Sequence, residues 1–278
     1  MLCYALQSVR TVQFSERGNL RLSEEEFATF CDYYPAAPDQ SGGGVEGSAP
    51  GLWYGRGPSN RPDADLAQFG SGMSRSRLLQ LDADVPTLEL CIATLAWGGM
   101  RGGNRNTLFN KSPSAWLGVA ERVREGQLTR GKAFDAFANV HRSGKSPGMG
   151  PAYYTKLIYF LMPRVPANPA GYIMDQWLGC SINLLFGQEV VLMNHTTTWT
   201  RQRSGKLKND VSSQVSPLNT STNYERFCQA LELLATRLGA GWTADQVELA
   251  LLSKGGHRPA AWRKHVKGAR SLTLLGAD

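Results

Sequence analysis

The stretch from residue 145 to residue 177 constrains the fold of this chain more than any other segment. It contains Pro147-Gly148-Met149-Gly150, and two glycines so close together predict a tight turn, because glycine adopts backbone conformations closed to other residues. Apolar residues at helical spacing precede this turn over 129–142 and follow it over 150–162. The sequence therefore predicts two helices joined by a short hairpin.

Two charged residues stand out in this stretch. Lys156 lies within the second hairpin helix among apolar neighbours that include Tyr153, Leu157 and Phe160. Burial disfavours an ammonium ion and lowers the pKa of a lysine, which makes the amine a better nucleophile. The alternative is a lysine whose amine reaches out to water. Asp175 follows a Pro-containing loop and begins the next apolar run, which is the position of a helix N-cap.

The charge balance favours a polyanionic partner. The chain has 278 residues, a formal net charge of +7 and an isoelectric point near 9.3. No apolar run is long enough to span a bilayer, and the first residues lack the layout of a signal peptide. We therefore expect a cytoplasmic protein with no membrane partner.

The hairpin carries groups suited to binding a phosphate backbone. The N–H groups at the start of a helix point at an anion, and the helix dipole favours its charge. Pro151 fits the first turn, where its missing N–H would be unpaired anyway. An ordinary turn between two helices is the alternative interpretation. The expected DNA contacts in this turn are Lys145, Pro147, Gly148, Met149 and Gly150.

A second unusual segment runs from Trp97 to Asn104, with four glycines around Arg101. If the polyanionic partner is DNA, we expect such a loop to pass close to it, with Arg101 and Asn104 in contact and Met100 or Arg101 filling the gap if a nucleotide is displaced from the duplex. A flexible connection between helices is the alternative. The five cysteines include no Cys-x-x-Cys pair, and the four histidines show no metal-ligand spacing, so we expect no metal and no cofactor.

The composition divides the chain into three expected parts: residues 1–72, with one helix and an irregular Gly/Pro-rich stretch, a helical core over 73–255, and a basic tail over 256–278. Ser23 is expected to cap a helix over 22–34, followed by an irregular loop over 35–62. Further expected elements are helices at 74–82, 86–100, 175–186, 223–238 and 243–253, a short strand or extended segment within 187–200, and a basic, Ser-rich loop over 201–222.

The segment 145–177 resembles the helix-hairpin-helix DNA glycosylases, the superfamily of 8-oxoguanine DNA glycosylase. In that family a lysine on the second hairpin helix attacks the sugar C1′ and an aspartate assists after a Gly/Pro-containing loop. Lys156 and Asp175, which are 19 residues apart, match these positions, and the loop 163–171 supplies the Gly and Pro. The stretch 155–159 looks most like the archaeal 8-oxoguanine glycosylases and the bacterial proteins of the same fold.

The resemblance implies a mostly α fold with two helical lobes around a DNA-binding cleft. It implies a monomer that binds double-stranded DNA, flips a modified base out of the stack and cuts its N-glycosidic bond. Lys156 would be the nucleophile, Asp175 would support the cation-like transition state, and a Schiff base would permit strand cleavage. The residues expected to line the base pocket are Trp97, Gln176 and Trp177.

The chain departs from the commonest family pattern in two respects. That pattern has the lysine two residues after the second glycine of the turn, where Ala152 stands here, so that Lys156 lies one helical turn further along. The iron–sulfur cysteine cluster of the family is also absent from the sequence. Whether Lys156 attacks C1′ itself or supports attack by water therefore stays open.

Other functions and substrates also stay open. A noncatalytic protein could use the hairpin alone, but binding phosphate needs no carboxylate, so the pair of Lys156 and Asp175 favours an enzyme. An oxidised purine is the default substrate of the family and implies repair, while bacterial relatives of this fold also attack modified cytosines of phage DNA and imply antiviral defence. The glycines of 98–103 would leave room for a bulky base, which favours the phage substrate.

Overall fold

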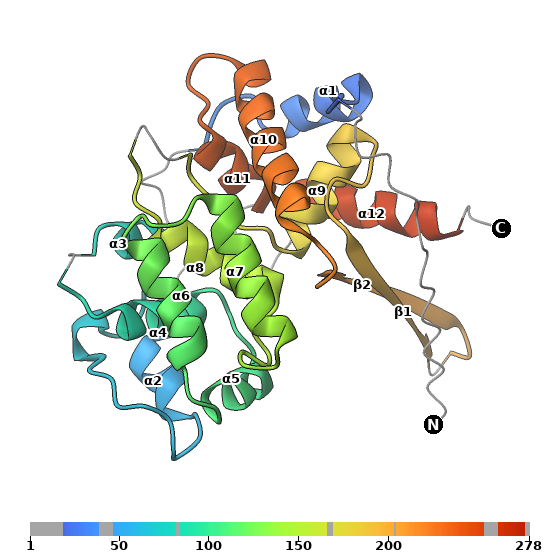
Figure 1. The fold of residues 1–278 in the computed structure, drawn as a ribbon. Coiled ribbons are helices and arrows are strands. Elements are labelled where there is room, and N and C mark those ends of the chain that lie inside the picture. The colour runs from blue at the N-terminus through green and yellow to red at the C-terminus, as the bar shows by residue number, and fades with distance from the viewer. Residues whose placement is uncertain are drawn as a thin grey trace.

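The computed structural model describes residues 19–38, 47–81, 84–165, 169–202, 204–252 and 261–275. Within these ranges the chain forms twelve α-helices, one short 3-10 helix over Ala67–Phe69 and one pair of strands. The helices form two groups, and the strands project beside them as a hairpin (Figure 1). The mostly helical fold expected from the sequence is confirmed.

The first helix group surrounds α4, which is buried along almost its whole length. Its members are α2 (Pro50–Gly55), α3 (Arg75–Leu79), α4 (Thr87–Trp97), α5 (Gly102–Phe109), α6 (Ser114–Arg124), α7 (Arg130–Arg142) and α8 (Pro151–Leu161). Apolar residues occur all round α4, so it is covered on several sides by α2, α3, α6 and α8. The predicted pair of helices around the Gly-containing turn is confirmed as α7 and α8.

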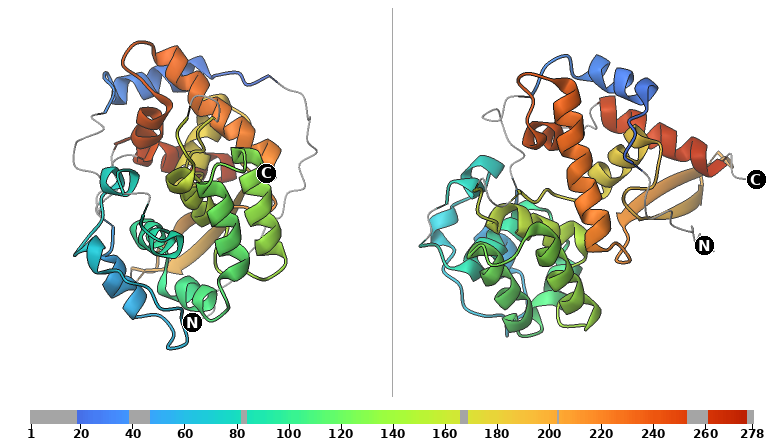
Figure 2. Two further views of the ribbon diagram at one scale, coloured as in Figure 1. Left: turned by 60° about the vertical axis from the view of Figure 1, so that its left-hand side comes forward. Right: turned by 45° about the horizontal axis from the view of Figure 1, so that its top comes forward.

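The second helix group surrounds α9 and contains the N-terminal and C-terminal helices (Figure 2). Its members are α1 (Glu24–Tyr33), α9 (Gln176–Phe186), α10 (Ser221–Leu238), α11 (Ala244–Leu252) and α12 (Ala261–Leu275). Helix α9 contacts the other four members of this group, while α10 also packs along α7 of the first group. None of the helices in the described ranges is both long and apolar enough to cross a bilayer.

The two strands form an antiparallel hairpin between α9 and α10. Strand β1 (Met193–Arg201) pairs with β2 (Leu207–Val215), with Met193 opposite Val215 at the root and Arg201 opposite Leu207 near the turn. The strand expected within 187–200 is confirmed, but the loop expected over 201–222 is wrong. Val211, Ser213 and Val215 are buried and alternate with exposed residues, which is the period of a strand.

Two helices lie where the sequence suggested irregular structure. Helix α2 falls within the expected loop over 35–62, and α5 begins at Gly102 inside the expected Gly-rich loop. They stabilise each other, because Tyr54 of α2 packs edge-on against Phe109 of α5 with ring centroids 4.9 Å apart. Arg105 of α5 also donates to the Trp53 carbonyl at 2.7 Å. Tertiary contacts therefore override the weak local propensity of both segments.

Candidate active site

The turn between α7 and α8 uses its glycines for different purposes. Gly148 has φ +80°, and a Cβ there would lie only 2.7 Å from the carbonyl oxygen of Asn104, so this glycine lets the turn pack on α5. Gly150 has φ −77° and open space where a Cβ would be. It forms the N-cap of α8 without a side-chain cap. Pro151 has no N–H and the N–H groups of Tyr153 and Tyr154 donate to the Gly150 carbonyl, so Ala152 offers the N–H at the start of α8 that an anion can approach.

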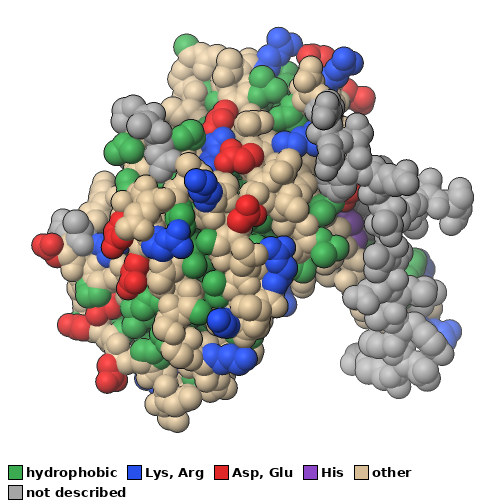
Figure 3. All heavy atoms as spheres, viewed as in Figure 1, with side chains coloured by type: hydrophobic (Ala, Val, Ile, Leu, Met, Phe, Trp, Pro, Cys, Tyr) green, Lys and Arg blue, Asp and Glu red, His purple; other side chains and the backbone are tan. Residues whose placement is uncertain are grey.

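The other residues of the turn differ in exposure. Lys145 is exposed, and Pro147 is partly exposed. Met149, expected among the DNA contacts, is fully buried in the hydrophobic core, so only its backbone can face a ligand. Figure 3 shows basic and acidic side chains interspersed in the middle of one face, with basic side chains in its lower part and acidic side chains along its left edge.

Lys156 is buried, with only 7% of its surface exposed. Its Nζ donates to the carbonyl oxygen of Ala152 at 2.8 Å and lies 5.5 Å from the ring centroid of Tyr153. The amine is therefore enclosed by its own helix and does not extend into solvent, contrary to the alternative of a solvated lysine.

Gly98 makes room for the Lys156 side chain. A Cβ on Gly98 would lie 2.5 Å from Cδ of Lys156 and 3.0 Å from Cε. The φ of Gly98 is −68°, a value open to any residue, so the requirement for glycine is steric. Of the glycines of 98–103 that were expected to leave room for a bulky base, Gly98 leaves none, because the Lys156 side chain fills that space.

Asp175 is the N-cap of α9, as its position in the sequence predicts. Its Oδ1 accepts from the backbone N–H of Trp177 at 2.8 Å and of Leu178 at 3.1 Å. One carboxylate oxygen thus satisfies two donors at the helix start, and the negative charge sits at the positive end of the helix dipole.

The backbone leading to Asp175 is held by three buried side chains. Thr155 accepts from the Met174 N–H at 3.1 Å, and Glu248 accepts from the Ile173 N–H at 2.9 Å. The hydroxyl of Tyr224 donates to the carbonyl of residue 172 at 2.8 Å. Because these side chains come from α8, α11 and α10, the carboxylate is fixed relative to both helix groups.

Lys156 and Asp175 lie on either side of the junction between the two helix groups, and their charges interact. Lys156 belongs to α8 of the first group, and Asp175 begins α9 of the second. Burial lowers the pKa of Lys156, while the carboxylates of Asp175 and Glu248 oppose this shift by favouring the ammonium form. The net direction is downward, so more of the amine is neutral at a given pH than for an exposed lysine.

Glu248 is the third charged group near the lysine, and sequence reasoning did not single it out. It is fully buried on α11 and forms an ion pair with Arg75 of α3. Burial raises the pKa of Glu248, and Arg75 partly offsets the rise. The one signal in the sequence is a lone acidic residue inside the apolar run Val247–Leu252.

The three residues expected to line a base pocket already have protein partners. Trp97 is buried and packs edge-on against Phe160, with ring centroids 5.0 Å apart. With its amide oriented to suit both neighbours, Gln176 donates to the Ser213 carbonyl at 2.6 Å and accepts from Trp177 Nε1 at 3.2 Å. Trp97 therefore supports α8 from inside the core, while Gln176 and Trp177 remain half-buried beside Asp175.

Arg263 of α12 also lies near Asp175 and was missed by sequence reasoning. Its guanidinium lies 4.7 Å from the ring centroid of Trp177 and donates to the Leu252 carbonyl. Burial lowers the pKa of Arg263, and the nearby charge of Asp175 opposes that shift. Asp175 is thus flanked by a cation on the side of the second helix group.

The segment after α4 also differs from the expected DNA loop. Arg101 is exposed and Asn104 is half-buried, so both can face a ligand. Met100 is buried, and its carbonyl accepts from Trp53 Nε1 at 3.0 Å. Met100 would have to leave the core to fill a gap in DNA, which leaves Arg101 as the exposed candidate at this position.

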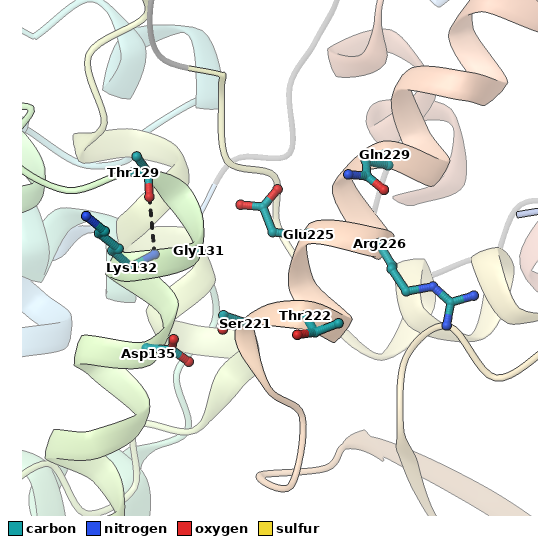
Figure 4. A pocket seen from close by; sticks show the side chains of 9 residues that line it. All are labelled: Thr129, Gly131, Lys132, Asp135, Ser221, Thr222, Glu225, Arg226 and Gln229. Carbon is teal, nitrogen blue, oxygen red and sulfur yellow. Dashed lines mark hydrogen bonds between the residues drawn. The ribbon is translucent and has the colours of Figure 1, made fainter. Parts of the chain in front are cut away.

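A hollow of about 420 Å³ lies elsewhere, between α7 and α10. Figure 4 shows Lys132 and Arg226 extending to opposite sides of it, with Glu225 and Asp135 between them. Carboxylates at the centre disfavour a phosphate ligand, and Glu225 is already paired with Arg130 at 2.8 Å. In the described part of the chain, no three His, Cys, Asp or Glu side chains are placed to hold a metal ion.

Comparison with known proteins identifies a family for most of the chain. The model of the family described as "Putative 8-oxoguanine DNA glycosylase OGG-like protein" matches residues 51–252. No curated protein and no solved structure matches the chain. The matched range contains the turn between α7 and α8, Lys156, Asp175 and Glu248.

Proposed function

Because the chain belongs to the family of OGG-like 8-oxoguanine DNA glycosylases, we propose that it removes a modified base from double-stranded DNA by cleaving the N-glycosidic bond. The observation that carries this proposal is the buried lysine of α8, whose charge is coupled to the carboxylate at the start of α9. A protein that only binds DNA gains nothing from a buried amine near a fixed carboxylate, since burying the Lys156 ammonium costs stability.

The proposed reaction begins when the turn between α7 and α8 holds the DNA backbone. The backbone at the N-terminus of α8, with its Ala152 N–H, and the exposed Lys145 bind phosphate, and one nucleotide flips out of the stack. The charge of Asp175 then stabilises the positive charge that develops at C1′ as the base departs.

Lys156 supplies the nucleophile in its neutral form. Nζ bonds to C1′ while the C1′–N bond breaks, and the bonding electrons leave with the base. The proton released from Nζ passes through solvent to the departing base, so charge and atoms balance. Opening of the sugar ring yields an imine, from which β-elimination cuts the strand or water releases an abasic site.

We further propose that the substrate carries a bulky substituent, as the hypermodified cytosines of phage DNA do, and that the protein acts in antiviral defence. Gly99 and Gly103 have open space where a Cβ would lie, and Gly99 is the next residue after Gly98, beside which Lys156 lies. Because glycine has no side chain, these positions leave space for a bulky substituent on the base, such as a sugar.

Base release from three duplexes tests both proposals. Phage DNA with hypermodified cytosine, a duplex with 8-oxoguanine and an unmodified duplex are incubated with the wild-type protein and with Lys156→Gln. We expect release from phage DNA by wild type and none by the variant. Efficient release of 8-oxoguanine alone would replace the defence proposal by a repair function. Binding without release from any duplex would leave only a DNA-binding protein.

A further inference from the structure

The β1–β2 hairpin extends beyond the helical body. In Figure 1 its root lies near α9 and its turn points away from both helix groups. The half nearer the body is covered, because Met193 and Val215 at the root and Val211 at the middle are buried, while residues 198–201 of β1 are exposed. A two-stranded ribbon is marginally stable by itself, so the protruding half adds little to the fold. This part of the chain is therefore available for a partner.

The root of the hairpin adjoins the candidate active site. The hairpin contacts α8 and α9, the two helices that carry Lys156 and Asp175. Gln176, the residue after Asp175, bonds the carbonyl of Ser213 on β2 at 2.6 Å. The ribbon is thus anchored one residue away from the proposed catalytic carboxylate, and whatever enters the site passes close to it.

One face of the hairpin continues outward from this anchor. Residues directly opposite in the register share a face, so His195 and Ser213 lie on the same side, and Trp199, an even number of residues beyond His195, shares that side. Along that face of β1, exposure rises from the buried root to Trp199, which is 48% exposed. Trp199 lies four residues beyond His195, which is about 13 Å along the strand.

The turn of the hairpin is basic. Arg201 and Lys206 are exposed next to Trp199. The sequence from 201 to 208 contains four Lys and Arg residues and no acidic residue. An aromatic ring flanked by cations suits nucleic acid, because rings stack on bases of any sequence and cations attract phosphates.

We propose that the hairpin is a second DNA-contacting arm. This proposal rests on the proposed glycosylase function. The ribbon lies in a groove of the duplex beside the flipped nucleotide, since a groove admits a two-stranded ribbon. Trp199 packs against the flanking DNA a few nucleotides from the target. Arg201 and Lys206 contact phosphates there, while the turn between α7 and α8 holds the backbone on the other side of the site.

Binding to an unmodified duplex, measured over a range of salt concentrations, tests this proposal without requiring catalysis. The variants are Trp199→Ala and the double change Arg201→Gln with Lys206→Gln. The control is Leu233→Ala on α10, whose side chain is 40% exposed and lies outside both DNA-contacting elements. All four proteins are first compared by thermal unfolding, and equal midpoints are expected because the changed side chains are exposed.

We expect Trp199→Ala to raise Kd by at least about fivefold. The double variant should reduce the slope of log Kd against log salt by about two. Leu233→Ala should match wild type. If the wild-type protein binds DNA and both hairpin variants bind it as tightly as wild type, the proposal of a DNA-contacting arm is refuted while the glycosylase proposal stands. If wild type fails to bind DNA, both proposals fail. A variant that changes only self-association would show that the hairpin is an interface between copies of the chain.

Discussion

At the scale of single residues, Gly98 determines where the Lys156 amine lies. Gly98→Ala would place a methyl group 2.5 Å from Cδ of Lys156, so the lysine must move. A displacement of about 1 Å in a reacting group costs about 100-fold in rate. We expect that loss in single-turnover base release, with unchanged affinity for DNA. Gly118→Ala on α6, where a Cβ meets no neighbour, is the matched control and should keep full activity.

Asp175 combines a structural and a proposed chemical role, and one substitution separates them. Asp175→Asn keeps an oxygen that can cap α9 but removes the negative charge. We expect base release to fall by at least about 100-fold, because the cation-like transition state loses its stabilising charge. The melting temperature should change little. Asp135→Asn on α7 serves as control, and equal rates for both variants would contradict the role of Asp175.

The sequence predicts part of this site because its two main residues belong to one continuous segment. The apolar surroundings of Lys156 and the cap position of Asp175 are both local patterns, and the structure has the lysine buried and the aspartate as the cap. Glu248 and Arg263 lie more than 70 residues further along the chain. Only tertiary packing brings them to the site, so no local pattern could identify them.

At the scale of elements, the two glycines of the hairpin turn should respond differently to substitution. Gly148 has a positive φ and no room for a Cβ, so Gly148→Ala should lower the free energy of unfolding by about 1–3 kcal/mol. Gly150 tolerates a side chain in the free protein, since its φ is −77° and its Cβ position is open.

Gly150→Val should therefore fold normally but weaken DNA binding for all sequences alike, because the side chain blocks the N-terminus of α8 and phosphate contacts carry no base information. Urea unfolding and duplex binding at one salt concentration measure the two effects. A Gly150→Val protein that binds as tightly as wild type would exclude the turn as a phosphate site.

Elements with strong caps were predictable, and elements that depend on distant partners were not. Thr129 caps α7 by accepting from the Lys132 N–H, and Ser23 caps α1 in the same way. Helices α2 and α5 are short and rich in glycine, so they form because they pack on each other. In strand β2, Val211, Ser213 and Val215 alternate with Ser212 and Gln214, but the basic, Ser-rich composition of the surrounding stretch 201–222 concealed this period-two signal.

At the scale of the whole molecule, the site depends on how the two helix groups are joined. Arg75 of the first group pairs with Glu248 of the second, and Arg130 pairs with Glu225 and Glu232 of α10. Both arginines are buried, and each links one group to the other. Since Lys156 and Asp175 belong to different groups, these pairs also fix the distance between the proposed nucleophile and carboxylate.

Arg75→Met should make stability depend more strongly on pH. The pKa of Glu248 lies above its ordinary 4.5 because of burial, and loss of Arg75 would raise it further. The folded state then holds a proton that the unfolded state has lost, so the free energy of unfolding falls as pH rises above 4.5 until the raised pKa is passed. We expect a small deficit relative to wild type near pH 4.5 and about 3–5 kcal/mol at pH 8.

Urea unfolding at both pH values measures this deficit. Arg164→Met is the control, because Arg164 pairs with Asp245 in a partly exposed position and should cost about 1 kcal/mol or less at either pH. A deficit for Arg75→Met that is the same at both pH values would show that Glu248 does not titrate as a buried, uncompensated carboxyl.

The most direct test of the account is to trap the covalent intermediate on its residue. Wild-type protein is incubated, in the presence of borohydride, with DNA that contains the modified base that the protein excises. The cross-linked peptide is then identified by mass spectrometry. We predict one adduct on Lys156, formed faster as pH rises because only the neutral amine attacks, and with a midpoint below 10.5 because burial lowers the pKa of Lys156. Lys156→Gln should bind the same DNA and form no adduct. An adduct on another amine such as Lys145, or base release by wild type with no adduct at all, would contradict the assignment of Lys156 as the nucleophile.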